Sequence, residues 1–356
     1  MSDILQGMSL DSTLPFETHT LVMESAKNPA MPGSAQSLAG LFKSPEFKKQ
    51  LASHLSTRYA TTVSEISNLD ENVFRIDRSG DVSWVARLLS PSLQISVILE
   101  DAEILRILEQ QDFPAERLAH PEPVSTTPAG YHVLITTFID GRRPRKREQI
   151  FPKLGDLLGR LHTLSLPEVR SVTRRGGAWH HICHSGGIRE ELDAALSLLE
   201  DAKLCVPKSE LHLYEELRNK LNEADDFSGL PQCFIHPDFV TSNSIISAVD
   251  NSIQIVDWSG AGTGPRVVSL GYLLWTAGQK SSTQMRAVAA AYATRVSLEE
   301  GEIMRLKSAM ISKPLILRSW EFSTARVSLE DSVKAIRSME ELVDTFSVIA
   351  KEALKS

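Results

Sequence analysis

The sequence predicts an α+β protein with two lobes, a small lobe built around an antiparallel sheet and a larger, mainly helical lobe. Residues 72–139 follow the order hairpin, helix, hairpin, whereas the chain beyond residue 147 mostly has helical spacing of its apolar residues. A short β segment within 234–256 interrupts this helical part. Strands and helices that are segregated along a chain are typical of α+β proteins. With 356 residues, 42% of them hydrophobic, the chain is long enough for two lobes that share a cleft.

Apolar, β-branched runs predict the strands of the small lobe. We expect these strands at 72–77, 82–89, 123–126 and 131–139. The first two runs are separated by Arg78-Ser79-Gly80-Asp81, which has the composition of a turn, and they should pair as a hairpin.

Two helices are predicted in the same lobe. The first begins at Ser44-Pro45-Glu46, where a candidate N-cap precedes a proline at the first helical position, and it continues to Tyr59 with apolar residues four apart. The second covers residues 93–110 and ends before Phe113-Pro114.

The larger lobe begins where the pattern changes after Asp140-Gly141, a suitable connector between lobes. Leucines 154, 157, 158 and 161 share one helical stripe, and further helices are expected near 188–203 and 208–226. We therefore divide the chain into three parts. They are an N-terminal extension over 1–43, which lacks sustained periodicity, a small lobe over 44–140 and a large lobe over 141–356.

The overall composition argues against several classes of function. The net charge of −7 gives no broad basic surface for nucleic acid. No stretch approaches the roughly 20 apolar residues that span a bilayer, and the first residues do not resemble a secretion signal. Three scattered cysteines, Cys183, Cys205 and Cys233, do not suggest a disulfide framework. We therefore expect a cytoplasmic protein with no nucleic-acid or membrane partner. The sequence does not predict its oligomeric state.

Three oxygen-bearing side chains form the most informative pattern. Asp238 lies in His236-Pro237-Asp238, Asn243 follows it by five positions, and Asp257 follows at the end of a predicted strand. Phosphoryl transfer requires a carboxylate that orients and deprotonates the attacking hydroxyl, together with hard oxygen ligands for Mg²⁺. Asp238 suits the first task, and Asn243 and Asp257 suit the second.

These residues resemble the motifs of the aminoglycoside phosphotransferase family, whose members are related to choline kinase and to protein kinases. Residues 236–243 are similar to the family's His-x-Asp-x-x-x-x-Asn catalytic loop, and Ile255-Val256-Asp257-Trp258 is similar to its metal motif. Residues 154–162, which end in Leu-His, resemble a buried helix of the family. The resemblance spans about residues 60–280 and implies a protein-kinase-like fold that uses ATP and Mg²⁺. It also implies a mainly structural role for His236.

The resemblance also implies where the nucleotide binds. Thr136-Thr137-Phe138-Ile139-Asp140-Gly141 is similar to the hinge between the lobes, so the backbone near Thr137 and Ile139 should contact adenine. Arg87 stands where the family has a lysine or arginine on its third strand, and it should contact the phosphates. Asp101 is the expected partner that holds Arg87, with Glu100 and Glu103 as alternatives. An arginine suits such bidentate contacts.

Two departures from the family pattern affect the nucleotide loop and the catalytic loop. Residues 68–71, Asn-Leu-Asp-Glu, contain no glycine, so close backbone contact with phosphates is less favoured there, and Asn72 is expected to assist. The family usually has an aspartate that braces the catalytic loop where this chain has Ser269. That change affects the rigidity of the loop more than its chemistry.

Three other patterns have competing interpretations. The basic run at 142–147 resembles a nuclear signal or an anion site, but the acidic chain favours a solvated face. Residues 180–184, His-His-Ile-Cys-His, contain zinc-ligand types at crowded spacing, which favours a substrate-facing loop with Trp179 as a stacking surface. Residues 260–265 imitate a dinucleotide fingerprint, but they fit a loop after Asp257 better.

The sequence thus predicts a kinase that phosphorylates a hydroxyl of a small molecule. An acidic wall made of Glu190, Glu191 or Asp193 would favour a cationic amine such as an aminoglycoside, but a sugar or an amino alcohol fits nearly as well. Two alternatives remain open. One is a catalytically silent binding protein with the kinase fold, and the other is a metal-dependent hydrolase built on the histidine cluster.

Overall fold

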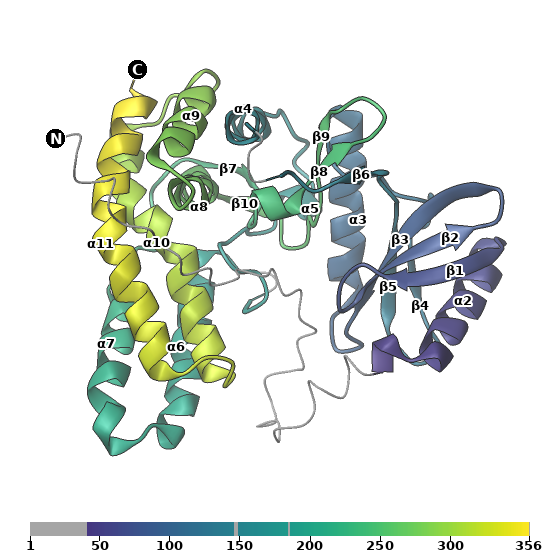
Figure 1. The fold of residues 1–356 in the computed structure, drawn as a ribbon, viewed down its shortest axis with the longest axis horizontal. Coiled ribbons are helices and arrows are strands. Elements are labelled where there is room, and N and C mark those ends of the chain that lie inside the picture. Colours follow the sequence, from purple (N-terminus) through teal and green to yellow (C-terminus); the bar gives the residue numbers. More distant parts are fainter. Residues whose placement is uncertain (1–40, 146–148, 184–185, 356) are drawn as a thin grey trace.

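The computed structural model describes residues 41–145, 149–183 and 186–355, and it has the two lobes that the sequence predicts (Figure 1). The small lobe contains a five-stranded antiparallel sheet, and the large lobe is mainly helical. The predicted α+β class is therefore confirmed. Most of the proposed N-terminal extension lies outside the described residues.

The sheet of the small lobe has the strand order β1-β2-β3-β5-β4. Its strands are β1 (Val63–Asn68), β2 (Val73–Arg78), β3 (Asp81–Leu89), β4 (Val124–Thr126) and β5 (His132–Thr137). The β2–β3 hairpin and the β4–β5 pair match the prediction. Strand β1 was not predicted, because this edge strand is mostly polar and half exposed and therefore carries little hydrophobic alternation.

One face of this sheet is covered by α2 (Pro45–Tyr59), whose apolar stripe packs into the small-lobe core. The helix begins as predicted, because the Ser44 hydroxyl accepts a hydrogen bond from the Phe47 amide at 3.2 Å. Phe42 was assigned to the extension, but it is fully buried against Phe47 and Phe74. The folded lobe therefore begins before Ser44.

Helix α3 (Ile95–Gln110) lies between the sheet and the large lobe (Figure 1). Its residues Ile98 and Ala102 pack against Leu134 of β5. After α3, residues 114–116 pair with the end of β9 (Ile253–Ile255) in the large lobe. The Ile255 amide donates to the Pro114 carbonyl at 2.8 Å. The Glu116 amide donates to the Ile255 carbonyl at 3.1 Å. The two lobes are thus joined by backbone hydrogen bonds close to Asp257.

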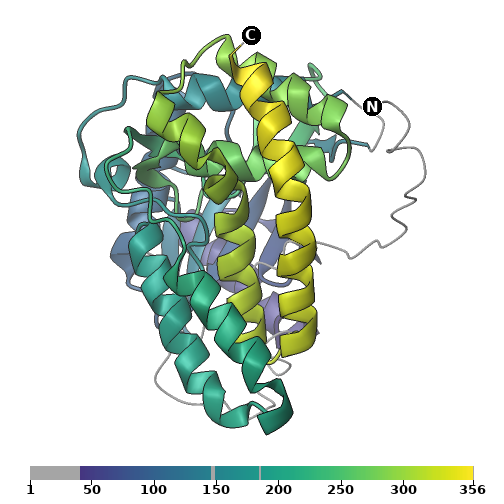
Figure 2. The same ribbon diagram turned by 90° about the vertical axis from the view of Figure 1, so that its left-hand side faces the viewer.

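The large lobe consists of two groups of helices (Figures 1 and 2). Long helices pack side by side as α6 (Ile188–Ala202), α7 (Leu211–Asn222), α10 (Glu300–Ser323) and α11 (Leu329–Leu354). Nearer the lobe connection lie α4 (Phe151–His162), α5 (Arg170–Thr173), α8 (Arg266–Gly278) and α9 (Ser282–Ala293). Within the described residues, no helix has a stretch that is both long and apolar enough to cross a membrane.

Two small sheets carry the functional segments. One contains β6 (Gly141–Arg142), β8 (Ser244–Ser247) and β9 (Ile253–Ile255), and the other pairs β7 (Gln232–Ile235) with β10 (Gly262–Pro265). Gly141 is required in the first sheet, because a Cβ there would lie 2.4 Å from the Ile246 carbonyl oxygen. Residues 262–265 were expected to be a loop, but they form β10, which places the turn after Asp257 beside β7.

Candidate active site

The catalytic-loop candidate follows β7, and its backbone is held by buried side chains. The His236 Nδ1 atom accepts from the Asp238 amide at 3.0 Å, so its Nε2–H donates to the Val256 carbonyl at 3.3 Å. Burial lowers the pKa of His236 to about 4, although Asp238 and Asp257 oppose this shift. His236 is therefore neutral near pH 7, and it ties the loop to the strand end that precedes Asp257.

The structure also shows what replaces the missing aspartate at position 269. Ser269 is buried in α8, and its hydroxyl donates to the His236 carbonyl at 3.0 Å. A different hydrogen bond thus braces the same loop, and the expected loss of rigidity is not seen in these contacts.

Both carboxylate oxygens of Asp238 are engaged. Asn243 donates through Nδ2 to Oδ2 at 2.9 Å, and the ammonium of Lys313 lies 2.5 Å from Oδ1. Asp238 is only 7% exposed, so these contacts fix its rotamer. Because the amide nitrogen of Asn243 is used on Asp238, its amide oxygen remains as a candidate metal ligand.

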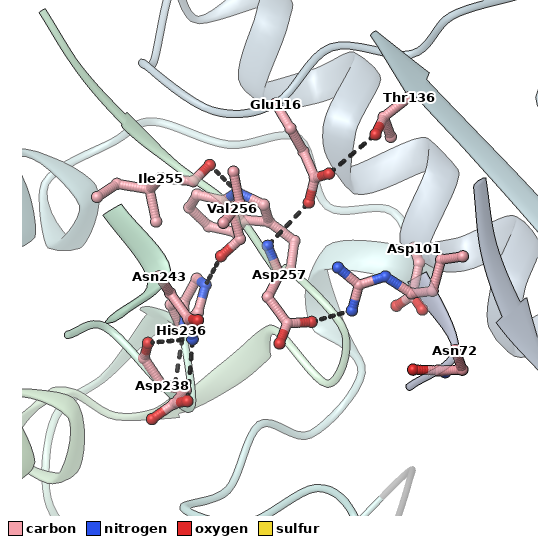
Figure 3. Close-up of polar contacts among 12 residues, drawn as sticks. Asn72, Asp101, Glu116, Thr136, His236, Asp238, Asn243, Ile255, Val256 and Asp257 are labelled. Carbon is pink, nitrogen blue, oxygen red and sulfur yellow. Dashed lines mark hydrogen bonds and ion pairs between the residues drawn. The ribbon is translucent and has the colours of Figure 1, made fainter. Parts of the chain in front are cut away.

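Asp257 lies between the Asp238–Asn243 pair on one side and Asp101 and Asn72 on the other (Figure 3). It adopts a left-handed backbone conformation with φ of 69°, which is uncommon outside glycine. Its amide donates to the Glu116 carboxylate at 2.9 Å, a contact that holds this conformation. Burial tends to raise the pKa of Asp257, but Arg87 and His181 outweigh it and hold the pKa below its usual value.

Arg87 lies in β3 of the small lobe and forms an ion pair with Asp257. Burial would lower the pKa of Arg87, but Asp257, Glu116 and Asp101 raise it above its ordinary value. The ion pair found for Asp101 is with Arg174, at 2.5 Å between Oδ1 and Nη2. Asp101 therefore contributes to the charge around Arg87, but the salt bridge found for Arg87 is with Asp257. Of the alternatives, Glu100 pairs with Arg170 and Glu103 pairs with Arg106.

The glycine-free loop before Asn72 is folded onto itself. The amides of Leu69 and Asp70 both donate to the Val73 carbonyl, at 2.9 and 3.1 Å. Asn72 donates through Nδ2 to the Leu88 carbonyl at 2.7 Å, whereas its Oδ1 is buried without a hydrogen-bond partner among the described residues. To assist phosphate binding as proposed, the Asn72 side-chain NH₂ group would have to exchange its hydrogen bond to the Leu88 carbonyl for one to phosphate.

The hinge candidate follows β5. The Thr137 amide donates to the Arg117 carbonyl at 2.8 Å, and the Phe138 amide donates to the Ser83 carbonyl at 2.9 Å. These two amides are therefore used within the lobe, and Ile139 becomes the position whose backbone amide should be tested for an adenine contact.

Of the three carboxylates of the expected acidic wall on α6, Glu191 is not accessible to a substrate. Glu191 is fully buried and accepts from the amides of Ala178 and Trp179, at 2.7 and 3.0 Å. Glu190 forms an ion pair with Arg175, and Asp193 lies 3.7 Å from Arg189. Glu191 is therefore removed from the expected wall, whereas Glu190 and Asp193 are partly exposed and stay candidates for contact with a cationic amine.

Of the histidine cluster, the described residues His180 and His181 belong to no recognisable metal centre, and His181 lies close enough to Asp257 to influence its charge. Among the described residues, which exclude His184, no group of three or more His, Cys, Asp or Glu side chains could hold a metal ion. The ring centroids of His180 and His181 lie 3.9 Å apart with the rings tilted by 38°, and the Trp179 ring lies 4.6 Å from that of His181. The loop that carries them packs against Gly260, where a Cβ would lie 2.2 Å from His180.

Sequence reasoning missed three charged residues that organise this region, namely Glu116, Arg174 and Lys313. Glu116 is buried and accepts from both the Thr136 hydroxyl and the Asp257 amide, and burial raises its pKa. Glu116 and Arg174 lie in irregular segments that no motif marks. Lys313 had one visible signal, because it is a charged residue within an apolar stretch of a predicted helical region.

The site thus contains a hydrogen bond between Asn243 and Asp238 in the large lobe and an ion pair between Asp257 and Arg87 that links the two lobes. A sequence profile described as the phosphotransferase enzyme family (APH) matches residues 62–302. The chain belongs to this family. The match covers the small-lobe sheet, the catalytic-loop candidate and Asp257. The search of curated proteins found no match.

Solved structures support the family assignment at the level of the fold, which is protein-kinase-like. A choline kinase from Streptococcus pneumoniae has 14% identity and a TM-score of 0.57, over 82% of this chain and 99% of its own. An aminoglycoside phosphotransferase from Alicyclobacillus acidocaldarius has 14% identity and a TM-score of 0.55, over 93% of this chain and 98% of its own. An ethanolamine kinase from Plasmodium vivax has 14% identity and a TM-score of 0.54, over 78% of this chain and 81% of its own.

Proposed function

We propose that this protein transfers the γ-phosphoryl group of ATP, in the presence of Mg²⁺, to a hydroxyl of a small molecule. The proposal is supported by the contact of Asp238 with Asn243 and by the ion pair of Asp257 with Arg87 of the small lobe. A hydrogen bond from the Val256 amide to the Asn243 carbonyl, at 3.0 Å, joins the two segments. Oxygen ligands, a candidate base and a phosphate-binding cation are the parts that phosphoryl transfer requires.

Asp238 is the proposed catalytic residue. Its two oxygens are held by Asn243 and Lys313, so the carboxylate is fixed before an acceptor arrives. Each carboxylate oxygen has a further lone pair that can accept the proton of the acceptor hydroxyl. Asp238 would thus orient this hydroxyl and remove its proton, so that catalysis relies mainly on positioning.

Asn243 and Asp257 are the proposed Mg²⁺ ligands. Their side chains offer an amide oxygen and a carboxylate, which suits a hard cation that keeps most of its water and phosphate ligands. When bound, Mg²⁺ neutralises charge on the nucleotide phosphates. Asp257 is held by Glu116 through its backbone and would exchange its contact with Arg87 for the metal, which frees Arg87 to bind phosphate.

The nucleotide side of the proposal includes Arg87, Asp101, Asn72 and the backbone of Thr137 and Ile139. Similar folds have been solved as an amicoumacin kinase with AMP-PNP and Ca²⁺ and as a spectinomycin phosphotransferase with ADP, which supports nucleotide binding by this protein. The family and the choline and ethanolamine kinases support a small-molecule hydroxyl as acceptor. The three cysteines form no disulfide, which suits the cytoplasm that we propose as its compartment.

The proposal is tested by measuring ADP formation from Mg·ATP with a panel of sugars, polyols, amino alcohols and aminoglycosides. Asp238→Asn should lower turnover about 10²- to 10⁴-fold while nucleotide affinity is retained. Asp257→Ala should instead weaken Mg·ATP binding. Full turnover of a true acceptor by Asp238→Asn would remove Asp238 from its proposed role.

A catalytically silent nucleotide-binding protein is the second candidate. It is favoured by the loop before Asn72, whose amides already donate within the lobe. Thermal unfolding with and without Mg·ATP separates the possibilities, because a ligand present at 100 times its Kd stabilises the folded state by about 2.7 kcal/mol. Stabilisation without ADP formation on a wide acceptor panel would support the silent protein, and no stabilisation would argue against nucleotide binding.

A further inference from the structure

Lys313 is a buried lysine at the acceptor side of the proposed active site. It lies in α10, is 2% exposed, and is surrounded in its helix by buried apolar residues such as Met310 and Ile316. Its ammonium lies 2.5 Å from Asp238 Oδ1 and donates to the Pro237 carbonyl at 3.1 Å. A buried lysine requires such partners, because an ammonium without them is strongly disfavoured in a protein interior.

Two aromatic rings complete the surroundings of this ammonium. The Lys313 Nζ atom lies 4.3 Å from the ring centre of Tyr272 and 5.0 Å from that of Trp179. Trp179 is itself fixed, because its amide donates to the buried Glu191 carboxylate. A carboxylate together with the faces of two aromatic rings is the arrangement that recognises an organic ammonium ion. In this protein, the ammonium is supplied by the chain.

This arrangement has a consequence for the acceptor. The hydroxyl that reacts must reach Asp238, so the groups beside that hydroxyl lie near the ammonium of Lys313. A second positive charge at this place would be repelled in a partly dehydrated site.

We propose that Lys313 is the built-in cation of the acceptor site, and that the acceptor is therefore a hydroxyl compound without an ammonium group next to the reacting hydroxyl. Neutral polyols and hydroxy acids fit this description, whereas simple amino alcohols do not. The inference rests on the proposed function of the same site. It makes Lys313 a positioning residue for Asp238 and a determinant of specificity.

The test compares acceptors in pairs that share a carbon skeleton. Ethylene glycol is paired with ethanolamine, 1,2-propanediol with 1-amino-2-propanol, and glycerol with 3-amino-1,2-propanediol. Phosphorylated product is measured directly. We expect kcat/KM of the full-length protein to favour the uncharged member of each pair by at least about tenfold, the size expected for repulsion between like charges a few ångströms apart.

Lys313→Met makes the test specific. It empties the ammonium position but leaves Asp238, Tyr272 and Trp179 to bind an ammonium from outside, so the preference should shift towards the amino member of each pair. Lys307→Met is the matched control on the same helix, because Lys307 is an exposed residue paired with Asp344. It should keep the wild-type preference.

A second measurement covers the case in which Lys313→Met folds poorly. In Lys313→Ala, added ethylammonium should restore turnover of the uncharged acceptor and stabilise the variant to heat, whereas tetraethylammonium, which is too large, should not. Failure of ethylammonium to restore turnover of the uncharged acceptor would contradict the inference.

The possible outcomes separate the two proposals. If the wild-type protein phosphorylates the amino members as well as or better than the uncharged ones, or if Lys313→Met leaves the preference unchanged, the inference about Lys313 is wrong and the proposed function stands. If no compound of either class is phosphorylated, the proposed function fails and this inference fails with it.

Discussion

The two halves of the proposed site are held in place in different ways. On the acceptor side, Asp238 is fixed within the large lobe by Asn243 and Lys313, and its loop is braced by His236 and Ser269. On the nucleotide side, the charged groups pair between segments from different lobes. Arg87 of β3 pairs with Asp257, and the α3 residue Asp101 pairs with Arg174.

This difference indicates how each half responds to a ligand. The acceptor side is preorganised, since its hydrogen bonds do not depend on how the lobes are oriented. The nucleotide side must exchange partners, because phosphate and metal would compete with the Arg87–Asp257 pair. Changes on the acceptor side should therefore affect stability and turnover, whereas changes on the nucleotide side should affect affinity for ATP.

The largest effect on stability is expected for Lys313→Met. Removing one partner of a buried ion pair leaves Asp238 charged and unpaired, which costs about 3–5 kcal/mol in the free energy of unfolding. Urea unfolding measures this loss. Lys307→Met should change stability by no more than about 0.5 kcal/mol. Adding Asp238→Asn to Lys313→Met should recover part of the loss, and an equal or larger loss in the double variant would contradict a direct coupling.

Glu191→Gln should change how stability depends on pH. Burial raises the pKa of Glu191 to about 8 in the folded protein, from 4.5 in the unfolded chain, although the backbone amides of Trp179 and Ala178 oppose this shift. The stability that the protonated carboxyl provides is present below pH 4.5 and is lost as the pH rises through 8.

Relative to Glu191→Gln, the wild-type protein should thus lose up to about 1.4 kcal/mol per pH unit within this window. Urea unfolding at several pH values between 5 and 8.5 measures the difference in slope. Glu200→Gln, in the same helix, is the control, because Glu200 is half exposed and pairs with Arg218. Parallel pH profiles for wild type and Glu191→Gln would contradict the raised pKa.

Arg87→Met tests the nucleotide half. It removes a charge-assisted contact to phosphate worth about 1.5–3 kcal/mol, so the Kd for Mg·ATP should rise roughly 10- to 100-fold. Isothermal titration with a non-hydrolysable ATP analogue measures this directly. Arg286→Met is the control, because Arg286 is exposed and pairs with Glu352 in the large lobe. Unchanged affinity in Arg87→Met would place the phosphates elsewhere.

Ser269→Ala should have the smallest effect. The variant loses the hydroxyl that donates to the His236 carbonyl, at a cost of about 1 kcal/mol in stability and a modest fall in turnover. Ser319→Ala removes an equally buried hydroxyl that donates to the Leu315 carbonyl at 2.8 Å. It should cost similar stability but leave turnover unchanged. Equal turnover in both variants would mean that Ser269 does not brace the catalytic loop.

Local sequence patterns predicted the elements with strong signals. The β2–β3 hairpin, α3 and the N-terminus of α2 were all found close to their expected residues, because turn chemistry and capping act within a few residues. The polar edge strand β1 and the buried Phe42 were not found. Strand β1 carries little hydrophobic alternation, whereas Phe42 is buried by packing against Phe74 and Tyr131, which are distant in the chain.

The sequence by itself determined the family, the α+β class and the spacing of Asp238, Asn243 and Asp257, because motif residues and hydrophobic periodicity are encoded locally. Only the tertiary structure decided which charges meet. Lys313 reaches Asp238 from 75 residues away, and Arg87 pairs with Asp257 across 170 residues. Such pairs depend on how helices and lobes pack, and packing leaves no local pattern in the chain.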